Sequence, residues 1–204
     1  MRGETDLARL FLAFLIAYLL GSVPFSFLLA KLKGNVDLSA KGSGNLGGTN
    51  AVRVLGWGHG VVAGLADITK GAVAVWLVDR QGGPTWCTAL AILVVTAGHN
   101  WSLFFRGKKG GKGISTTIGG FLYYTPTLTL VALGIALEVV FLSRLVSLAS
   151  LVFVTLLPIG LMIQGSDRQS ILISLVLVVF AFWWHRGNIQ RLQEGVERRL
   201  GEKT

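Results

Sequence analysis

Residues 114–142, ISTTIGGFLYYTPTLTLVALGIALEVVFL, decide how many times this chain crosses a membrane. The stretch is too long for one comfortable span, because a membrane helix needs about 20 apolar residues, and Pro126 interrupts it. The other apolar runs are each read as a single crossing. They cover residues 7–30, 60–78, 86–105, 146–163 and 171–184.

The distribution of lysine and arginine favours two crossings within residues 114–142. With one crossing, the basic tail after Trp184 would lie on the opposite side from the basic loops at residues 31–53 and 106–112, against the positive-inside tendency. With two crossings, joined by a turn at residues 123–127, fourteen of the 19 lysines and arginines lie on one side. The sequence therefore predicts seven transmembrane helices, with the N-terminus outside and the C-terminus in the cytoplasm.

Composition indicates an all-α integral membrane protein, since 52% of the 204 residues are hydrophobic and only 14% are charged. Without an internal repeat or a low-complexity linker, residues 1–204 are predicted to form a single polytopic membrane domain. The expected fold is a seven-transmembrane-helix bundle with polar loops and short or re-entrant elements on the cytoplasmic side, such as residues 114–123. The single cysteine, Cys87, excludes an intrachain disulfide and a thiolate metal cluster.

The first polar stretch, KGSGNLGGTNAVRVLG at residues 41–56, has the composition of an anion site. Its glycines permit turns with positive φ, and backbone N–H groups exposed in such loops or at a helix start bind anions. Ser43, Asn45 and Asn50 supply short polar side chains, and Arg53 lies one turn into the following helix, where it can clamp a phosphate. The alternative is a flexible inner loop with snorkelling cations.

The second polar stretch, NWSLFFRGKKGGKGISTT at residues 100–117, resembles a P-loop but fails its pattern. Arg106 stands where the first glycine is required, and Gly113 stands where Ser or Thr should follow the lysine, so nucleotide hydrolysis is excluded. Lys112, supported by Gly110 and Gly111 at the start of a helix, remains suited to a phosphate. A positive-inside signal would explain the other lysines but not the glycines.

The third polar stretch, HRGNIQRLQEGVERR at residues 185–199, follows the last apolar run. At helical spacing, His185 and Asn188 share a face, and the later charges are typical of an interfacial amphipathic helix. The residues leave open whether His185 serves a site or is an ordinary interfacial histidine. Ser147, upstream, either packs between helices or faces the polar site.

Asp67 and Lys70 lie three residues apart inside a predicted span. Because an unpaired charge in a membrane is costly, we expect these two residues to pair with each other or with the inner polar site.

Together, the three stretches resemble the signature motifs of the bacterial acyl-phosphate:glycerol-3-phosphate acyltransferase family, PlsY, in the same order. The resemblance extends to GSVPFSFLLAK at residues 21–31 and DITKG at residues 67–71, and it covers nearly the whole chain. Two departures are Ser102, where family members usually carry proline, and a spacing from His99 to Lys112 that is one residue longer.

The resemblance implies a multi-pass enzyme of the bacterial inner membrane that transfers an acyl group from acyl phosphate to the 1-hydroxyl of glycerol 3-phosphate. The products would be lysophosphatidic acid and phosphate, in the first step of phospholipid synthesis. It implies no metal or other cofactor, and as partners the two substrates and membrane lipid, with no nucleic acid. The catalytic positions carried over are Ser43, Arg53, Lys112, His185 and Asn188. The substrate-binding positions are Gly44, Asn45, Asn50, Gly110, Gly111, Ser147 and Glu197.

The expected mechanism is direct attack by the glycerol hydroxyl, because an acyl phosphate has a good leaving group and the chain has no G-x-S-x-G nucleophile elbow. The amides of residues 43–45, with Lys112 and Arg53, would neutralise phosphate charge, and the base would be His185 or a substrate phosphate oxygen. All three stretches are expected to meet in one cavity at one leaflet. The alternative from another class is an anion or lipid-phosphate transporter.

Overall fold

The computed structural model describes residues 6–104 and 110–202, and all the secondary-structure elements assigned in those ranges are helices. The chain divides between Tyr124 and Thr125 into two compact units, which are described separately below. The turn predicted at residues 123–127 is therefore also the boundary between the units. One domain over residues 1–204 stays a prediction.

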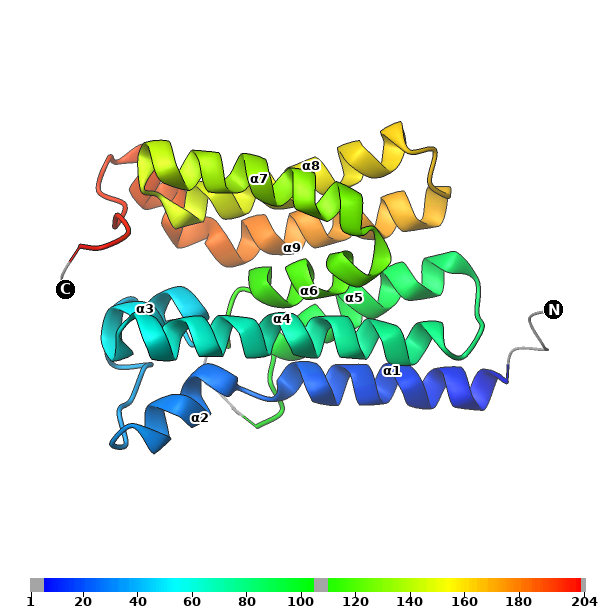
Figure 1. Ribbon diagram of the computed structural model, residues 1–204, viewed down its shortest axis with the longest axis horizontal. Coiled ribbons are helices and arrows are strands. Elements are labelled where there is room, and N and C mark those ends of the chain that lie inside the picture. Colours follow the sequence, from blue (N-terminus) through cyan, green and yellow to red (C-terminus); the bar gives the residue numbers. More distant parts are fainter. Residues whose placement is uncertain (1–5, 105–109, 203–204) are drawn as a thin grey trace. The chain divides into compact units, whose positions relative to one another are not determined.

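The first unit contains six helices in its described ranges. They are α1 (Leu7–Ser22), α2 (Phe25–Leu32), α3 (Gly48–Leu55), α4 (Trp57–Asp79), α5 (Thr85–Asn100) and α6 (Ile114–Tyr124). The long helix α4 is the centre of this unit, because it packs against each of the other five, and Figure 1 shows it running beside α1.

The apolar run at residues 7–30, expected as one helix, is broken into α1 and α2. Pro24 has no N–H to donate, and it disfavours helical backbone at the residue before it. Val23 accordingly has φ −65° and ψ 117°, in the extended region. At this break the Val23 carbonyl accepts a hydrogen bond from the Lys70 side chain.

Helices α4 and α6 approach too closely for side chains at two glycines. A Cβ on Gly71 would overlap the carbonyl oxygen of Thr116, and one on Gly119 would overlap the carbonyl oxygen of Ile68. Gly71 and Gly119 thus allow these two helices to pack closely.

The second unit contains α7 (Pro126–Ser143), α8 (Val146–Ile163) and α9 (Arg168–Gln193), and α8 packs against the other two. Pro126 is the first residue of α7, a position where a missing N–H costs nothing. Helix α9 continues nine residues beyond Trp184, the end of the expected apolar run, so His185 and Asn188 lie on regular helix as their spacing predicts.

Among the described residues, five segments are long and apolar enough to cross a membrane. They are Leu7–Leu32, Trp57–Asp79, Pro126–Ser143, Val146–Ile163 and Arg168–Gln193. Helix α5 has 16 residues and α6 only 11, both shorter than the roughly 20 residues that a perpendicular crossing requires. Seven crossings and the orientation of the termini stay predictions.

Candidate active site

The loop before α3 is organised by the carboxamide of Asn50, a residue only 2% exposed. Its Oδ1 accepts the Ser43 N–H at 2.8 Å, and its Nδ2 lies 2.8 Å from the Asn45 carbonyl oxygen and 3.1 Å from those of Leu38 and Lys41. Because these contacts occupy both ends of the amide, Asn50 holds the loop in shape. Its predicted contact with substrate stays a prediction.

The same hydrogen bonds correct the expected role of the loop amides. The Ser43 N–H donates to Asn50, and the Gly44 N–H donates to the Lys41 carbonyl at 3.0 Å, so two of the three amides expected to face an anion already have partners inside the loop. The predicted positive φ is confirmed at Gly42 and Gly44, at +60° and +68°. Besides its amides, this segment has the exposed Ser43 side chain and the partly buried Arg53 side chain on α3.

The glycine–lysine segment, Gly110 to Lys112, lies against the end of α5 and leads into α6. A Cβ on Gly110 would overlap the carbonyl oxygen of His99, and one on Gly111 would overlap His99 Nε2. Gly113 has φ +80°, and its carbonyl accepts the Thr117 N–H at 2.8 Å as α6 begins. Glycine is thus required sterically beside Lys112. The predictions on Arg106, Lys108 and Lys109, and much of the longer loop spacing, lie outside the described residues.

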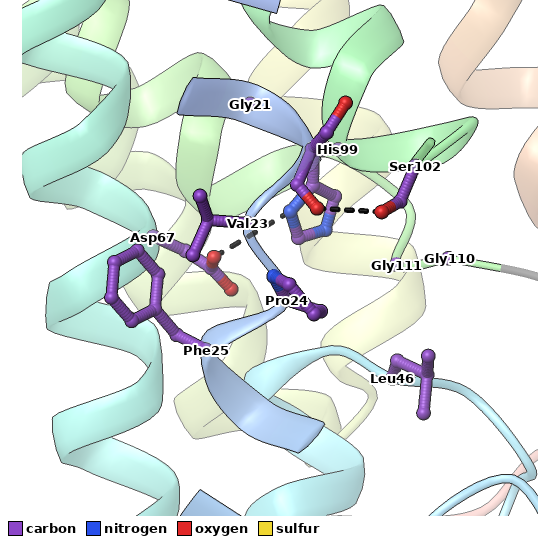
Figure 2. Close-up of a pocket in the computed structure, with 11 residues that line it drawn as sticks. Gly21, Val23, Pro24, Phe25, Leu46, Asp67, His99, Ser102, Gly110 and Gly111 are labelled. Carbon is purple, nitrogen blue, oxygen red and sulfur yellow. Dashed lines mark hydrogen bonds and ion pairs between the residues drawn. The ribbon is translucent and has the colours of Figure 1, made fainter. Parts of the chain in front are cut away.

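The two glycine-rich loops meet within the first unit, as the sequence predicts. Asn45 Nδ2 donates a long hydrogen bond of 3.5 Å to the Gly110 carbonyl. A pocket opens beside this contact (Figure 2). It is lined by Leu46, Gly110 and Gly111 from the two loops, by the residues that connect α1 to α2, and by Asp67 and His99. Ser102, at the position usually proline, donates to the Ser22 carbonyl at 2.5 Å and also lines the pocket.

A buried polar cluster forms one wall of this pocket and was only partly predicted. Lys70 Nζ lies 2.7 Å from Asp67 Oδ1, which confirms the expected pair. The same Nζ lies 2.9 Å from the Val23 carbonyl oxygen and 2.9 Å from His99 Nδ1. His99 was not predicted as a member of this cluster. A lysine buried with one carboxylate still has two protons that need acceptors, but the sequence does not identify the residues that supply them.

A second group of predicted site residues converges within the second unit. The Glu197 carboxylate accepts hydrogen bonds from Ser147 Oγ at 2.9 Å, from Asn188 Nδ2 at 2.5 Å and from Arg191 Nε at 2.8 Å. Burial alone would raise the pKa of the Glu197 carboxyl, but the hydrogen bonds from Asn188, Ser147 and Arg191 and the charge of Arg191 lower it below the ordinary value. Glu197 is therefore an ionised anchor that holds Asn188 in place.

His185 lies on α9 one turn before Asn188 and is 3% exposed. Its Nδ1 lies 2.8 Å from the Ala181 carbonyl oxygen, and a carbonyl can only accept, so Nδ1 carries a proton. In the neutral ring the lone pair is then on Nε2. This is the tautomer in which Nε2 can accept a proton.

Comparison with known proteins identifies the family. A family model described as glycerol-3-phosphate acyltransferase matches residues 11–195. The chain is 39% identical to a glycerol-3-phosphate acyltransferase of Thermus thermophilus over 190 residues, which are 93% of this chain and 94% of the relative. It is 42% identical to that of Halalkalibacterium halodurans over 193 residues, 92% of this chain and 93% of the relative.

Two solved structures that are similar to this chain are also of a glycerol 3-phosphate acyltransferase. A crystal structure of PlsY, an integral membrane glycerol 3-phosphate acyltransferase, in its glycerol 3-phosphate form has a TM-score of 0.89 at 35% identity and covers 94% of this chain and 96% of that chain. The lysophosphatidic acid form has a TM-score of 0.86 at the same identity, covering 94% of this chain and 95% of that chain.

The fold and the site define a multi-pass helical membrane protein whose two glycine-rich loops meet at a pocket that Asp67 and His99 also line. The chain belongs to the glycerol-3-phosphate acyltransferase family, PlsY.

Proposed function

We propose that this protein transfers an acyl group from acyl phosphate to the 1-hydroxyl of glycerol 3-phosphate, giving lysophosphatidic acid and inorganic phosphate. The observation that carries the proposal is the meeting of the Ser43–Asn50 loop with the Gly110–Lys112 segment, in a chain of this family. Both substrates carry a phosphate, and the two loops together offer Arg53, Lys112 and short donors to anions.

The reaction needs no covalent enzyme intermediate. The oxygen of the glycerol 1-hydroxyl attacks the carbonyl carbon of the acyl phosphate, a new ester bond forms, and the bond from that carbon to the bridging phosphate oxygen breaks. Phosphate leaves with the bonding electrons. The hydroxyl proton passes either to His185 Nε2 or to a phosphate oxygen of a substrate.

Each residue of the two loops has a role that follows from its side-chain chemistry. Lys112 and Arg53 neutralise phosphate charge, and Ser43 adds a hydroxyl donor. Gly44, Asn45 and Asn50 shape the first loop, and Gly110 and Gly111 let a phosphate oxygen approach the backbone closely.

In the second unit, His185 and Asn188 orient glycerol 3-phosphate, and Ser147 and Glu197 fix the Asn188 amide. We place the protein in the bacterial inner membrane, with its C-terminus in the cytoplasm, where lipid solvates the acyl chain.

Purified protein in detergent, mixed with palmitoyl phosphate and glycerol 3-phosphate, tests the proposal by phosphate release. We expect release only when both substrates are present. A transporter would instead concentrate glycerol 3-phosphate or phosphate inside sealed vesicles without releasing phosphate from the acyl donor. A protein that only binds anionic lipid would do neither, and either result would refute the proposal.

A further inference from the structure

Lys70 lies at the centre of the buried cluster in the first unit, and its amino group joins α4 to two other parts of the chain. Its Nζ lies 2.7 Å from Asp67 Oδ1, one turn earlier on α4, and 2.9 Å from the Val23 carbonyl oxygen at the break between α1 and α2. It also lies 2.9 Å from His99 Nδ1, near the end of α5. Lys70 therefore connects α1, α4 and α5 at one point.

The contacts of Lys70 with Val23 and His99 do more than balance charge. The side chains of Lys70 and Asp67 are 3% and 2% exposed, and the Asp67 carboxylate is enough to neutralise the ammonium group. The other two contacts satisfy the remaining N–H groups of Lys70 and fix the break between α1 and α2, and the end of α5, against α4.

The glycine–lysine segment packs directly on His99. A Cβ on Gly110 would overlap the carbonyl oxygen of His99, and a Cβ on Gly111 would overlap its ring at Nε2. The ring thus contacts Lys70 at Nδ1 and the backbone of Gly111 on its opposite side. A ring that is no longer held by Lys70 would free the backbone that leads to Lys112.

We infer that Lys70 is a positioning residue for acyl transfer: through the His99 ring, it sets where the Gly110–Lys112 segment, and with it the Lys112 ammonium group, meets a phosphate. This inference rests on the proposed function. The Lys70 side chain is 3% exposed and acts on the segment, not on a substrate. A displacement of about 1 Å at a catalytic group can cost about 10²-fold in rate, so the loss of this positioning is measurable.

A double substitution separates positioning from the balance of charge. Lys70→Met alone leaves the buried Asp67 carboxylate without its cation, which destabilises the fold. Lys70→Met combined with Asp67→Asn leaves no unpaired charge, and we expect this double variant to fold. Its KM for glycerol 3-phosphate, with palmitoyl phosphate as the donor, should rise about tenfold or more, because the His99 ring and the segment on it are no longer held. A wild-type KM in the double variant would overturn the inference.

Thr88→Val is the matched control, because it breaks a hydrogen bond between the same two helices at their other end. Thr88 Oγ1 on α5 donates to Asp79 Oδ1 on α4 at 3.1 Å. We expect this variant to lower the thermal unfolding temperature but to leave the KM for glycerol 3-phosphate unchanged. If both variants raised this KM equally, loosening of α4 against α5 in general would explain the effect, and the role of Lys70 would be refuted.

Hydrogen exchange gives a test that does not depend on activity. In the double variant, the protection factors of residues 110–117 should fall, including that of the Thr117 N–H, which donates to the Gly113 carbonyl at 2.8 Å. In Thr88→Val they should match the wild type. Unchanged protection in the double variant would overturn the inference while the proposed function stood. An inactive wild type with lowered protection in the double variant would instead refute the function and leave the link from Lys70 to the segment intact.

Discussion

At the residue scale, Lys112 is the cation that we propose to bind phosphate most directly. It is flanked by Gly110, Gly111 and Gly113, and a Cβ at each of the three would overlap atoms of α5, so this backbone tolerates no side chains beside Lys112. Replacing such a cation removes the stabilisation of charge that develops on the leaving phosphate.

We therefore expect Lys112→Ala to lower kcat/KM by about 10²–10³. Phosphate release at saturating acyl phosphate measures the effect, and Lys112→Arg is the control that keeps the charge. The thermal unfolding temperature should stay within a few degrees of the wild type. An active K112A protein would remove Lys112 from the mechanism.

The close contact between Gly111 and His99 leads to a second prediction. Its Cβ would overlap His99 Nε2, and the ring cannot move aside because Lys70 and Asp67 hold it. Gly111→Ala should raise the KM for glycerol 3-phosphate about tenfold or more, because the added methyl group pushes the glycine–lysine segment away from His99 and displaces Lys112. Gly134→Ala on α7, where a Cβ meets nothing within 4 Å, is the matched control and should leave KM unchanged.

At the element scale, the end of α9 is tied to α8 by Glu197, and the Leu200 N–H donates to the Arg144 carbonyl at 2.7 Å. The side chain of Glu197 is 6% exposed and accepts from Ser147, Asn188 and Arg191, so its charge is the centre of this junction.

The lowered pKa of Glu197 predicts how this junction responds to acid. Because the folded pKa lies below the ordinary value of 4.5, the stabilisation is fully present above that pH and is lost as pH falls through the folded pKa. The hydrogen-exchange protection factors of residues 194–200, which are corrected for the intrinsic pH dependence of exchange, should therefore fall in acid in the wild type. In Glu197→Gln these protection factors should be low already at neutral pH and change less with pH. A wild type that showed no change down to about pH 3 would contradict this role.

The sequence predicted some elements and contacts well and others poorly, for physical reasons. Hydropathy and Pro126 located α6, α7 and the turn between them, and helical spacing placed His185 and Asn188 on one helix. The role of Asn50 was not predictable, because a carboxamide offers the same donors and acceptors to a loop as to a substrate. His99 depends on contacts with residues 29 and 32 positions earlier in the chain, which no local pattern reports.

At the scale of the whole molecule, the membrane orientation follows from the charge distribution and stays a prediction. In a Cys87→Ser background, single cysteines at the exposed positions Ala40, Thr85 and Glu202 test it. A membrane-impermeant maleimide added to intact spheroplasts should label only Thr85→Cys, because Ala40→Cys and Glu202→Cys are predicted to face the cytoplasm. Labelling of all three would contradict the predicted topology.

The predictions on activity depend on one proposed reaction, in which this protein joins an acyl group from acyl phosphate to glycerol 3-phosphate. Lysophosphatidic acid and phosphate, quantified together from purified protein given both substrates, test that reaction itself. We predict equal molar amounts of the two products, and no lysophosphatidic acid when acyl-CoA replaces acyl phosphate. Phosphate formed without lysophosphatidic acid, or equal yields from acyl-CoA, would contradict the proposed reaction.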